Sequence, residues 1–206
     1  MTSTTKQWQT DPVSLQKKEL RKNIAARLAN VSAEEVRRQS DIVIDKVLSS
    51  SWFKNARRMS VYVHTSGEVE TDRIVLESLK QGKQLFIPKF AKGNLRMRLL
   101  RVPSQREFLE LKPTLWGIRQ PDDSDCWEDH EDTGALDLIL MPGVAFTTDG
   151  CRLGHGMGYY DRALAAHQQQ FGAMPAIYGL ALTQQIVDQV PLSETDVKLD
   201  GVIKAD

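Results

Sequence analysis

The chain has 206 residues, 41% hydrophobic and 26% charged, a composition typical of a globular protein rather than a disordered one. Its 27 basic and 27 acidic residues leave no net charge, which excludes the broad positive field used in non-specific nucleic-acid or membrane binding, so we expect neither partner. Cys126 and Cys151 form no zinc or disulfide spacing and no run reaches about 20 apolar residues, so we expect a soluble protein with reduced thiols.

The first residues of the chain are polar. Residues 1–13 contain Lys6 as their single basic residue and do not resemble an Arg-rich transit peptide. We therefore predict a flexible tail over 1–13, one domain over 14–206 and a cytoplasmic location, with mitochondrial import left open.

Two helices are predicted next. Leu20, Ile24 and Leu28 recur at i, i+4 and i+8, which predicts a helix over 14–28 with one apolar stripe. Ser32 and Glu35 have the spacing of a capping box and predict the start of a second helix.

The middle of the chain alternates strands and helices. A β-prone run predicts a strand over 59–63, followed by a loop with Glu68 and Glu70. The next elements are a helix over 71–81 that Gly82 ends, a strand over 84–87 that Pro88 ends, and an alternating strand over 95–99. The last strand indicates an antiparallel hairpin at a sheet edge.

The second half begins with an irregular stretch over 115–133, a predicted loop whose role as a lid stays open. The apolar run 137–141 is typical of a central parallel strand covered on both faces. A helix over 159–167, a strand over 176–180 and a helix over 184–189 follow. This order predicts a single-domain α/β protein, a three-layer α/β/α fold with a mostly parallel central sheet and an antiparallel edge hairpin.

The glycine-rich segment 150–162 is the strongest candidate for a functional site. Gly154, Gly156 and Gly158 stand at every second position, where backbone N–H groups can converge on an anion. Arg152 and the start of the following helix would add positive charge. The spacing matches neither a Walker A loop nor a dinucleotide fingerprint. If only the glycines are considered, a tight turn between two elements explains them equally well. Asp161, considered alone, is explained equally well as an acid that stabilises the first turn of a helix.

The flanking residues carry a family resemblance. The run from Asp137 to Phe146 and the segment from Gly150 to Arg162 are similar to the signature of the 5-formyltetrahydrofolate cyclo-ligase family, also called 5,10-methenyltetrahydrofolate synthetases. The resemblance extends to the segments 17–21, 68–71, 116–118, 185–191 and 196–197, and so covers about residues 17–202.

The resemblance implies an enzyme, an ATP-dependent ligase that uses Mg2+. It would convert 5-formyltetrahydrofolate and ATP to 5,10-methenyltetrahydrofolate, ADP and phosphate, by phosphorylation of the formyl oxygen and attack by N10. The implied partners are ATP and a reduced folate, with or without a polyglutamate tail, and the expected state is a monomer. Two alternatives are a non-catalytic paralogue that binds nucleotide or folate as a regulatory module, and an RNA-binding protein led by the basic N-terminal helix.

The resemblance also implies the site residues. Lys17, Arg21 and Arg152 would be the catalytic residues that stabilise phosphate charge. The implied ATP contacts are Lys17, Lys18, Glu19, Leu20, Arg21, Arg152, Leu153, Gly154, His155, Gly156, Met157, Gly158, Tyr159 and Tyr160. The implied folate contacts are Arg21, Val63, Glu68, Trp116, His155, Gly156, Met157, Gly158 and Tyr159. The implied magnesium ligands are Asp161 and Asp196.

Some of these residues have a second interpretation. Glu68 also fits a solvated loop charge, and Val63 and Trp116 also fit core residues. His155 and Met157 fill variable positions between the glycines, where some family members carry Arg or Lys. The affinity for ATP is therefore left open.

Overall fold

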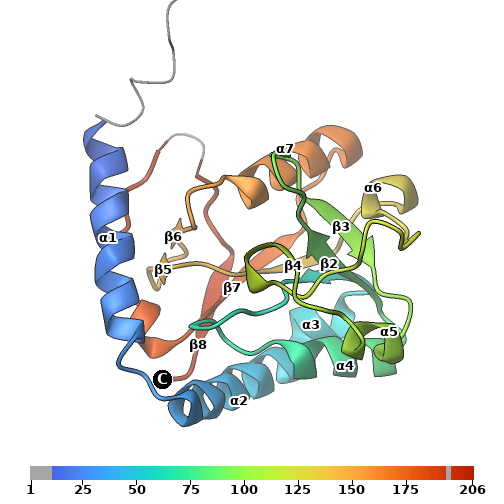
Figure 1. Cartoon of the computed structure of the whole chain (residues 1–206), viewed down its shortest axis with the longest axis horizontal. Helices are drawn as coiled ribbons and strands as arrows, with labels where there is room; N and C mark the ends of the chain where they lie inside the picture. The colour runs from blue at the N-terminus through green and yellow to red at the C-terminus, as the bar shows by residue number, and fades with distance from the viewer. Residues whose placement is uncertain (1–10, 194–195) are drawn as a thin grey trace, which may run out of the picture.

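A computed structural model describes residues 11–193 and 196–206 of the chain (Figure 1). Its centre is a six-stranded sheet in the order β3-β2-β1-β4-β7-β8. The strands are β1 (Arg58–Val61), β2 (Gln84–Lys89), β3 (Arg98–Arg101), β4 (Leu138–Met141), β7 (Ala176–Ala181) and β8 (Gly201–Lys204). Neighbouring strands are parallel except β2 and β3, which form an antiparallel hairpin at one edge.

Helices cover both faces of this sheet. One face carries α2 (Ala33–Ser49), α3 (Ser51–Asn55) and α4 (Asp72–Lys80), and the other carries α7 (Tyr159–Phe171), as Figure 1 shows. Residues of β4 alternate between the two cores, with Leu138 in the first and Ile139 in the second. A strand buried on both faces explains the apolar run in the sequence. The predicted three-layer α/β/α class is confirmed.

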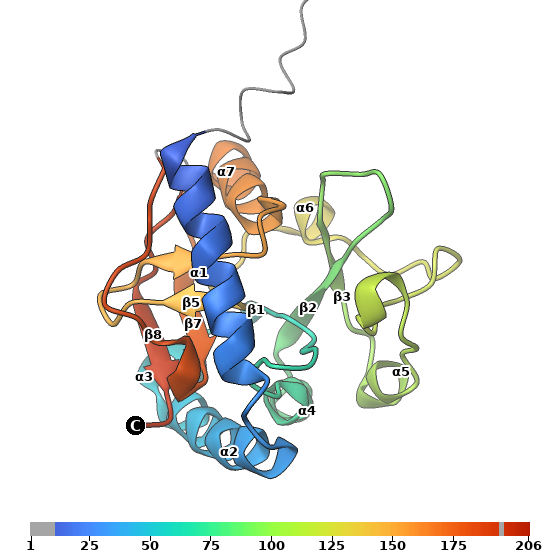
Figure 2. The same cartoon turned by 60° about the vertical axis from the view of Figure 1, so that its left-hand side comes forward.

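The N-terminal helix α1 (Pro12–Leu28) lies beside the sheet and not in either main layer (Figure 2). It packs on the short hairpin of β5 (Ala145–Phe146) and β6 (Arg152–Leu153), with Ile24 fully buried in this contact. Asp11 caps the helix by accepting hydrogen bonds from the backbone N–H groups of its first turn. None of the described helices is long and apolar enough to cross a lipid bilayer.

The start of α1 differs from the prediction. The helix begins at Pro12, two residues earlier than expected, so Pro12 and Val13 of the predicted tail are helical. Proline at the first helical position loses no hydrogen bond, which explains the earlier start. Residues 1–10 of the predicted tail lie outside the described residues.

Several predicted bounds were wrong, and the strand predicted over 95–99 lies at Arg98–Arg101. Tertiary pairing explains two of the differences. The strand predicted to end at Pro88 continues to Lys89 because β3 pairs with it there, whereas its pairing with β1 reaches only Phe86. The helix predicted over 184–189 is a single 3-10 turn, η3 (Thr183–Gln185). The chain leaves the helical path there because Ile186 and Val187 pair with the backbone of Phe146 in β5.

Several short elements were not predicted at all. They are α3, α5 (Gln105–Leu109), the 3-10 turn η2 (Leu115–Gly117), α6 (His130–Thr133), β5, β6 and β8. Most of them are too short to show a period in the sequence, and their neighbours in space hold them in place.

Candidate functional site

A cavity of about 740 Å³ opens between α1, the glycine-rich loop before α7 and the segment that contains η2. Residues that follow the carboxyl ends of β1 and β4 form its floor, among them Val63 and Pro142. Parallel sheets place their ligand sites at such strand ends. The cavity is lined by Asp11, Val13, Ser14, Lys17, Arg21, Tyr62, Val63, Thr65, Glu68, Pro88, Phe90, Trp116, Ile118, Pro142, Arg152–Asp161, Ser193 and Asp196.

The structure brings nearly all of the predicted site residues together in this cavity. The exceptions are Lys18, Glu19 and Leu20, which lie on α1 but do not line it. Lys18 and Glu19 are exposed, and Leu20 packs with Ile24 against the β5–β6 hairpin. On α1, therefore, Lys17 and Arg21 face the cavity because they are one helical turn apart.

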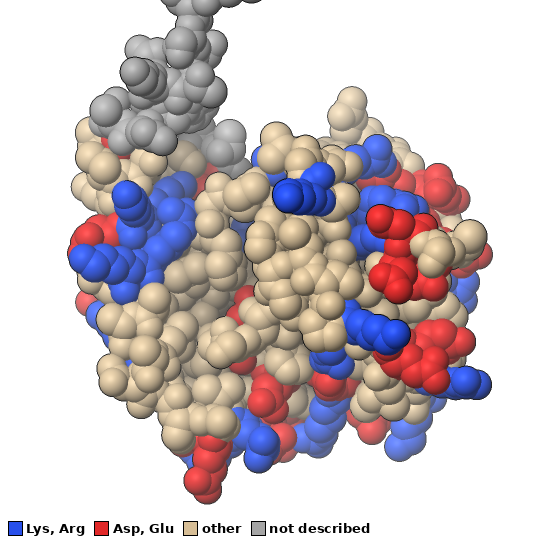
Figure 3. Space-filling view, viewed as in Figure 1, with Lys and Arg blue, Asp and Glu red and all other residues tan. Residues whose placement is uncertain are grey.

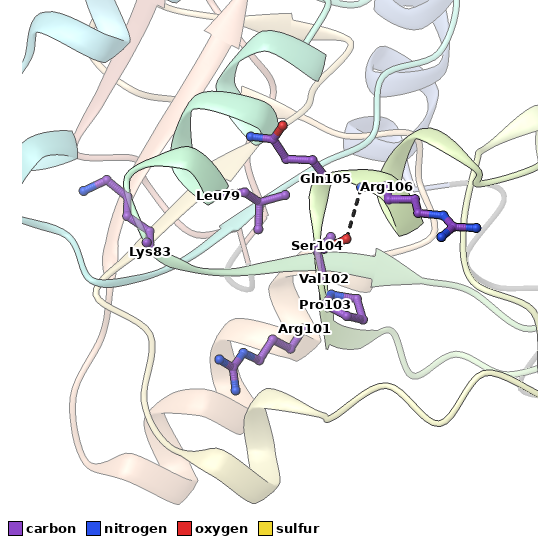
Figure 4. A pocket seen from close by; sticks show the side chains of 9 residues that line it. Leu79, Lys83, Arg101, Val102, Pro103, Ser104, Gln105 and Arg106 are labelled. Atoms are coloured by element: carbon purple, nitrogen blue, oxygen red, sulfur yellow. Dashed lines mark hydrogen bonds between the residues drawn. The ribbon is translucent and has the colours of Figure 1, made fainter.

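A second hollow, of about 460 Å³, lies where β3 leads into α5 (Figure 4). Its three basic side chains are already engaged. Lys83 donates to three backbone carbonyls at the end of α3, Arg101 pairs with Glu128, and Arg106 pairs with Glu110. We place the candidate site in the first cavity, which is larger and contains the glycine-rich loop.

The glycine-rich loop requires glycine for two reasons: some positions have positive φ angles, and at another a side chain would collide with Arg152. Gly156 and Gly158 have φ angles of +95° and +63°, a region that other residues rarely adopt. A Cβ at Gly154 would lie 2.9 Å from Nη1 of Arg152. Arg21 lies against the loop and donates from Nε to the carbonyl oxygen of Gly154 at 2.8 Å. The loop thus leaves its surface open for a ligand and fixes one cation beside it.

Arg152 is a buried cation with an unused donor. Its side chain donates to the carbonyl oxygen of Pro142 at 3.3 Å and to Oδ1 of Asp161 at 3.2 Å. Its Nε is buried and has no hydrogen-bond partner among the described residues. An unpaired buried donor costs about 1–3 kcal/mol, more when it is charged, so the ligand-free protein leaves part of this guanidinium unsatisfied.

Lys17 and Asp196 form the second ion pair of the cavity. The Nζ of Lys17 lies 2.6 Å from Oδ2 of Asp196 and donates to Oγ of Ser193 at 3.0 Å. Burial opposes ionisation of Asp196, but the hydrogen bonds from Lys17 and Ser193 prevail and lower its pKa. We call Lys17, Arg152, Asp161 and Asp196 the charged wall. Figure 3 shows lysine and arginine side chains gathered over α1.

The charged wall bears on the predicted magnesium site. No cluster of three or more histidine, cysteine or carboxylate side chains that could hold a metal occurs in the described part of the chain. Asp161 and Asp196 nevertheless line the same cavity. Mg2+ is often held by one or two carboxylates together with phosphate oxygens and water, so this donor set fits the ion only when a phosphate ligand is present.

Glu68 is a carboxylate of the cavity that is held by hydrogen bonds and forms no ion pair among the described residues. Its Oε2 accepts hydrogen bonds from N and Oγ1 of Thr65, at 2.8 and 3.1 Å. Burial raises the pKa of Glu68, although the bonds from Thr65 and the charges of His155 and His64 oppose the shift. The solvated-loop interpretation is therefore not supported, because Glu68 lines the cavity.

An aromatic wall, formed by Phe90, Trp116 and Tyr159, bounds another part of the cavity. The ring of Phe90 lies 5.0 Å from that of Tyr159 and 5.9 Å from that of Trp116, both edge to face. Trp116 is 56% exposed and has a φ angle of +58°. This exposure counts against the core interpretation of Trp116, whereas Val63 is 3% exposed and serves both the core and the cavity.

Sequence reasoning missed several residues of the cavity. They include Tyr62, Thr65, Phe90, Ile118 and Ser193. Thr65 follows a predicted strand and is a signal that could have been used. Phe90 and Ser193 carried no such signal, because the fold alone brings them to the cavity.

Comparisons with known proteins agree with this arrangement. The model of the 5-formyltetrahydrofolate cyclo-ligase family matches residues 13–205. A Caenorhabditis elegans protein named as a probable 5-formyltetrahydrofolate cyclo-ligase is 50% identical over 91% of each chain. The mouse 5-formyltetrahydrofolate cyclo-ligase is 39% identical over 94% of this chain and 96% of its own. The NMR structure of Aquifex aeolicus 5,10-methenyltetrahydrofolate synthetase superimposes with a TM-score of 0.72 and 33% identity, covering 91% of this chain and 88% of the other.

Proposed function

Because the chain belongs to the 5-formyltetrahydrofolate cyclo-ligase family and is thus a ligase, we propose that its cavity holds 5-formyltetrahydrofolate beside ATP and closes the 5,10-methenyl ring. The observation that carries this proposal is the convergence of Lys17, Arg21 and Arg152 with the glycine-rich loop on one cavity. Phosphate oxygens are the acceptors that such a group of cations and backbone donors fits.

The reaction needs ATP because a formyl group on nitrogen is amide-like and its oxygen is a poor leaving group. The formyl oxygen attacks the γ-phosphorus, and ADP leaves. N10 then attacks the formyl carbon, loses its proton, and the oxygen departs as phosphate. No protein nucleophile is needed, so this chain contributes positioning and charge stabilisation.

The ATP end of the cavity is the charged wall. Lys17, Arg21 and Arg152 bind the phosphates, and the N–H groups of the glycine-rich loop add donors. Asp161 and Asp196 would hold Mg2+, which when bound neutralises charge on the phosphates. In the ligand-free protein these carboxylates pair with Arg152 and Lys17. ATP would thus offer Lys17 and Arg152 new anionic partners, and Mg2+ would offer Asp161 and Asp196 a new cationic one.

The folate end contains Glu68 and the aromatic wall. Because Thr65 occupies only Oε2 of Glu68, the second oxygen can accept hydrogen bonds from the pterin amino and ring N–H groups. The rings of the aromatic wall offer a flat apolar surface of the kind that an aromatic substrate packs against.

The assay for the activity is direct. Purified protein is mixed with 5-formyltetrahydrofolate, Mg2+ and ATP, and the methenyl chromophore is followed by absorbance. An increase that requires ATP supports the proposal. Binding of ATP or folate without any increase would instead favour the regulatory paralogue.

The magnesium ligands need a test that does not depend on turnover. We expect Asp161→Asn and Asp196→Asn to raise the Mg2+ concentration needed for binding of a non-hydrolysable ATP analogue, measured by calorimetry. The exposed Asp149→Asn, whose partner is Lys198 outside the cavity, is the matched control. Unchanged Mg2+ dependence in both site variants would remove these two ligands from the proposal.

We also propose three further properties that the sequence predicts. Residues 14–206 form a single domain, which limited proteolysis tests. The protein is a monomer, which light scattering tests. It resides in the cytoplasm, which fractionation of the source cells tests.

A further inference from the structure

Gln120 is a buried glutamine directly behind the aromatic wall. Its side chain is 6% exposed and does not line the cavity. Its Oε1 accepts a hydrogen bond from the backbone N–H of Phe90 at 3.0 Å, and its Nε2 donates to the carbonyl oxygen of Phe90 at 2.9 Å. One side-chain amide thus satisfies both backbone groups of one residue.

The side chain of Gln120 makes the hydrogen bonds to Phe90 that a neighbouring strand would make in a sheet. Phe90 comes directly after the last residue of β2, beyond the register in which β2 pairs with β1 and β3. A buried backbone group without a partner is costly, so the amide of Gln120 selects this backbone position for Phe90. The same position directs the ring of Phe90 into the cavity, against Trp116 and Tyr159.

Gln120 also belongs to the segment that carries Trp116. Between them, Ile118 lines the cavity, and Nη2 of Arg119 donates to Oδ1 of Asp72 at 2.5 Å, at the start of α4. The segment is therefore attached on two sides, to β2 through Gln120 and to α4 through Arg119. Two members of the aromatic wall, Phe90 and Trp116, are joined through Gln120.

We propose that Gln120 is a positioning residue for folate binding, which fixes the aromatic wall in the shape that receives the flat aromatic part of the substrate. This inference rests on the proposed function. Gln120 touches neither substrate nor ATP, and it acts through the backbone of Phe90.

The test separates positioning from general stability. Gln120→Met keeps the volume of the side chain and removes both hydrogen bonds. We expect the KM for 5-formyltetrahydrofolate to rise about 5- to 10-fold, with the KM for ATP unchanged, because the charged wall is intact. A rise of both KM values together, or of neither, would overturn the inference.

The control is another buried glutamine with similar contacts. Gln39 is 1% exposed, accepts from the N–H of Thr183 at 2.8 Å and donates to Glu35 at 2.8 Å, but it does not line the cavity. Gln39→Met should lower the stability and leave both KM values unchanged. If Gln39→Met raises the folate KM as much as Gln120→Met does, the role of Gln120 is only structural.

A second variant keeps the test decisive if Gln120→Met does not fold. Phe90→Leu leaves the backbone pairing with Gln120 in place and removes the ring, and it should raise the folate KM about 10-fold. An unchanged folate KM in Phe90→Leu would overturn the inference. A failure of the proposed function is distinct, since the wild-type protein itself would then form no methenyl product.

Discussion

The charged wall and the aromatic wall of the cavity are prepared for ligands in different ways. In the charged wall, Lys17 and Arg152 are paired with Asp196 and Asp161. A charged ligand that binds there competes with these partners. In the aromatic wall, the rings of Phe90, Trp116 and Tyr159 pack on one another at distances of 5.0 to 6.1 Å, and a ligand displaces only water from them.

This difference explains why the two walls need different support. Ion pairs in the ligand-free protein prevent the cost of unpaired buried charge, so the charged wall is stable without ATP. An aromatic surface needs a fixed shape, because its contacts weaken steeply with distance. Gln120 and the Arg119–Asp72 pair hold that shape from behind. Substitutions in the charged wall should therefore affect ATP, and those in the aromatic wall should affect folate.

The largest effect is expected for Arg152→Ala. Loss of this guanidinium removes a charge that we propose stabilises the transferring phosphoryl group, so kcat/KM for ATP should fall about 100- to 1,000-fold. The matched control is Arg101→Ala in the second hollow, where Arg101 pairs with Glu128. Steady-state kinetics with the methenyl absorbance measures both. Equal kinetics for the two variants would show that Arg152 has only a structural role.

Glu68→Gln tests a carboxylate of the cavity that belongs to neither wall. The substitution removes a charged acceptor, so kcat/KM for the folate should fall about 10- to 100-fold. Because burial raises the pKa of Glu68 in the folded protein, the folded state binds a proton more tightly than the unfolded state does. Glu68 therefore opposes folding at pH values above its folded pKa.

The stability of Glu68→Gln sharpens that prediction. We expect its free energy of unfolding at pH 7 to equal or exceed that of the wild type, measured with urea, although its folate kinetics are impaired. In the wild type, the folate KM should rise as the pH falls through the raised pKa, and the variant should lack this dependence. A variant that loses stability and activity together would contradict the assignment of Glu68 to substrate binding.

A comparison of Lys17→Ala with Lys18→Ala tests which of these two adjacent lysines of α1 contributes to ATP binding. Lys17 lines the cavity and pairs with Asp196, whereas Lys18 is exposed and does not line it. We expect the KM for ATP to rise about 10-fold in Lys17→Ala and to stay unchanged in Lys18→Ala. The folate KM should change in neither variant. An equal effect at Lys18 would show that the family resemblance was right to include both residues.

The two walls also differ in how far the sequence predicts them. The glycine-rich loop and Arg152 are adjacent in the chain, so the sequence offered an anion site there, although the glycine spacing alone fitted a tight connection equally well. The apolar run of β4 indicated a central strand. The pairing of Gln120 with Phe90 joins residues 30 positions apart and leaves no local pattern. The same limit explains the wrong helix over 184–189, since the decisive contacts come from Phe146. Local sequence thus predicts contacts within one turn or strand, and tertiary pairing decides the others.

The smallest effect is expected for Tyr159→Phe. This substitution tests whether the aromatic wall depends on the hydroxyl of Tyr159 or only on its ring. The hydroxyl of Tyr159 donates to the carbonyl oxygen of Asn94 at 3.1 Å, in the turn between β2 and β3, and the ring faces Phe90. Removing the hydroxyl should lower the free energy of unfolding by about 1 kcal/mol, the usual net value of one hydrogen bond. Because the ring stays, the folate KM should change less than about 2-fold. A large rise in folate KM would mean that the turn over Asn94, and not ring packing alone, sets the shape of the wall.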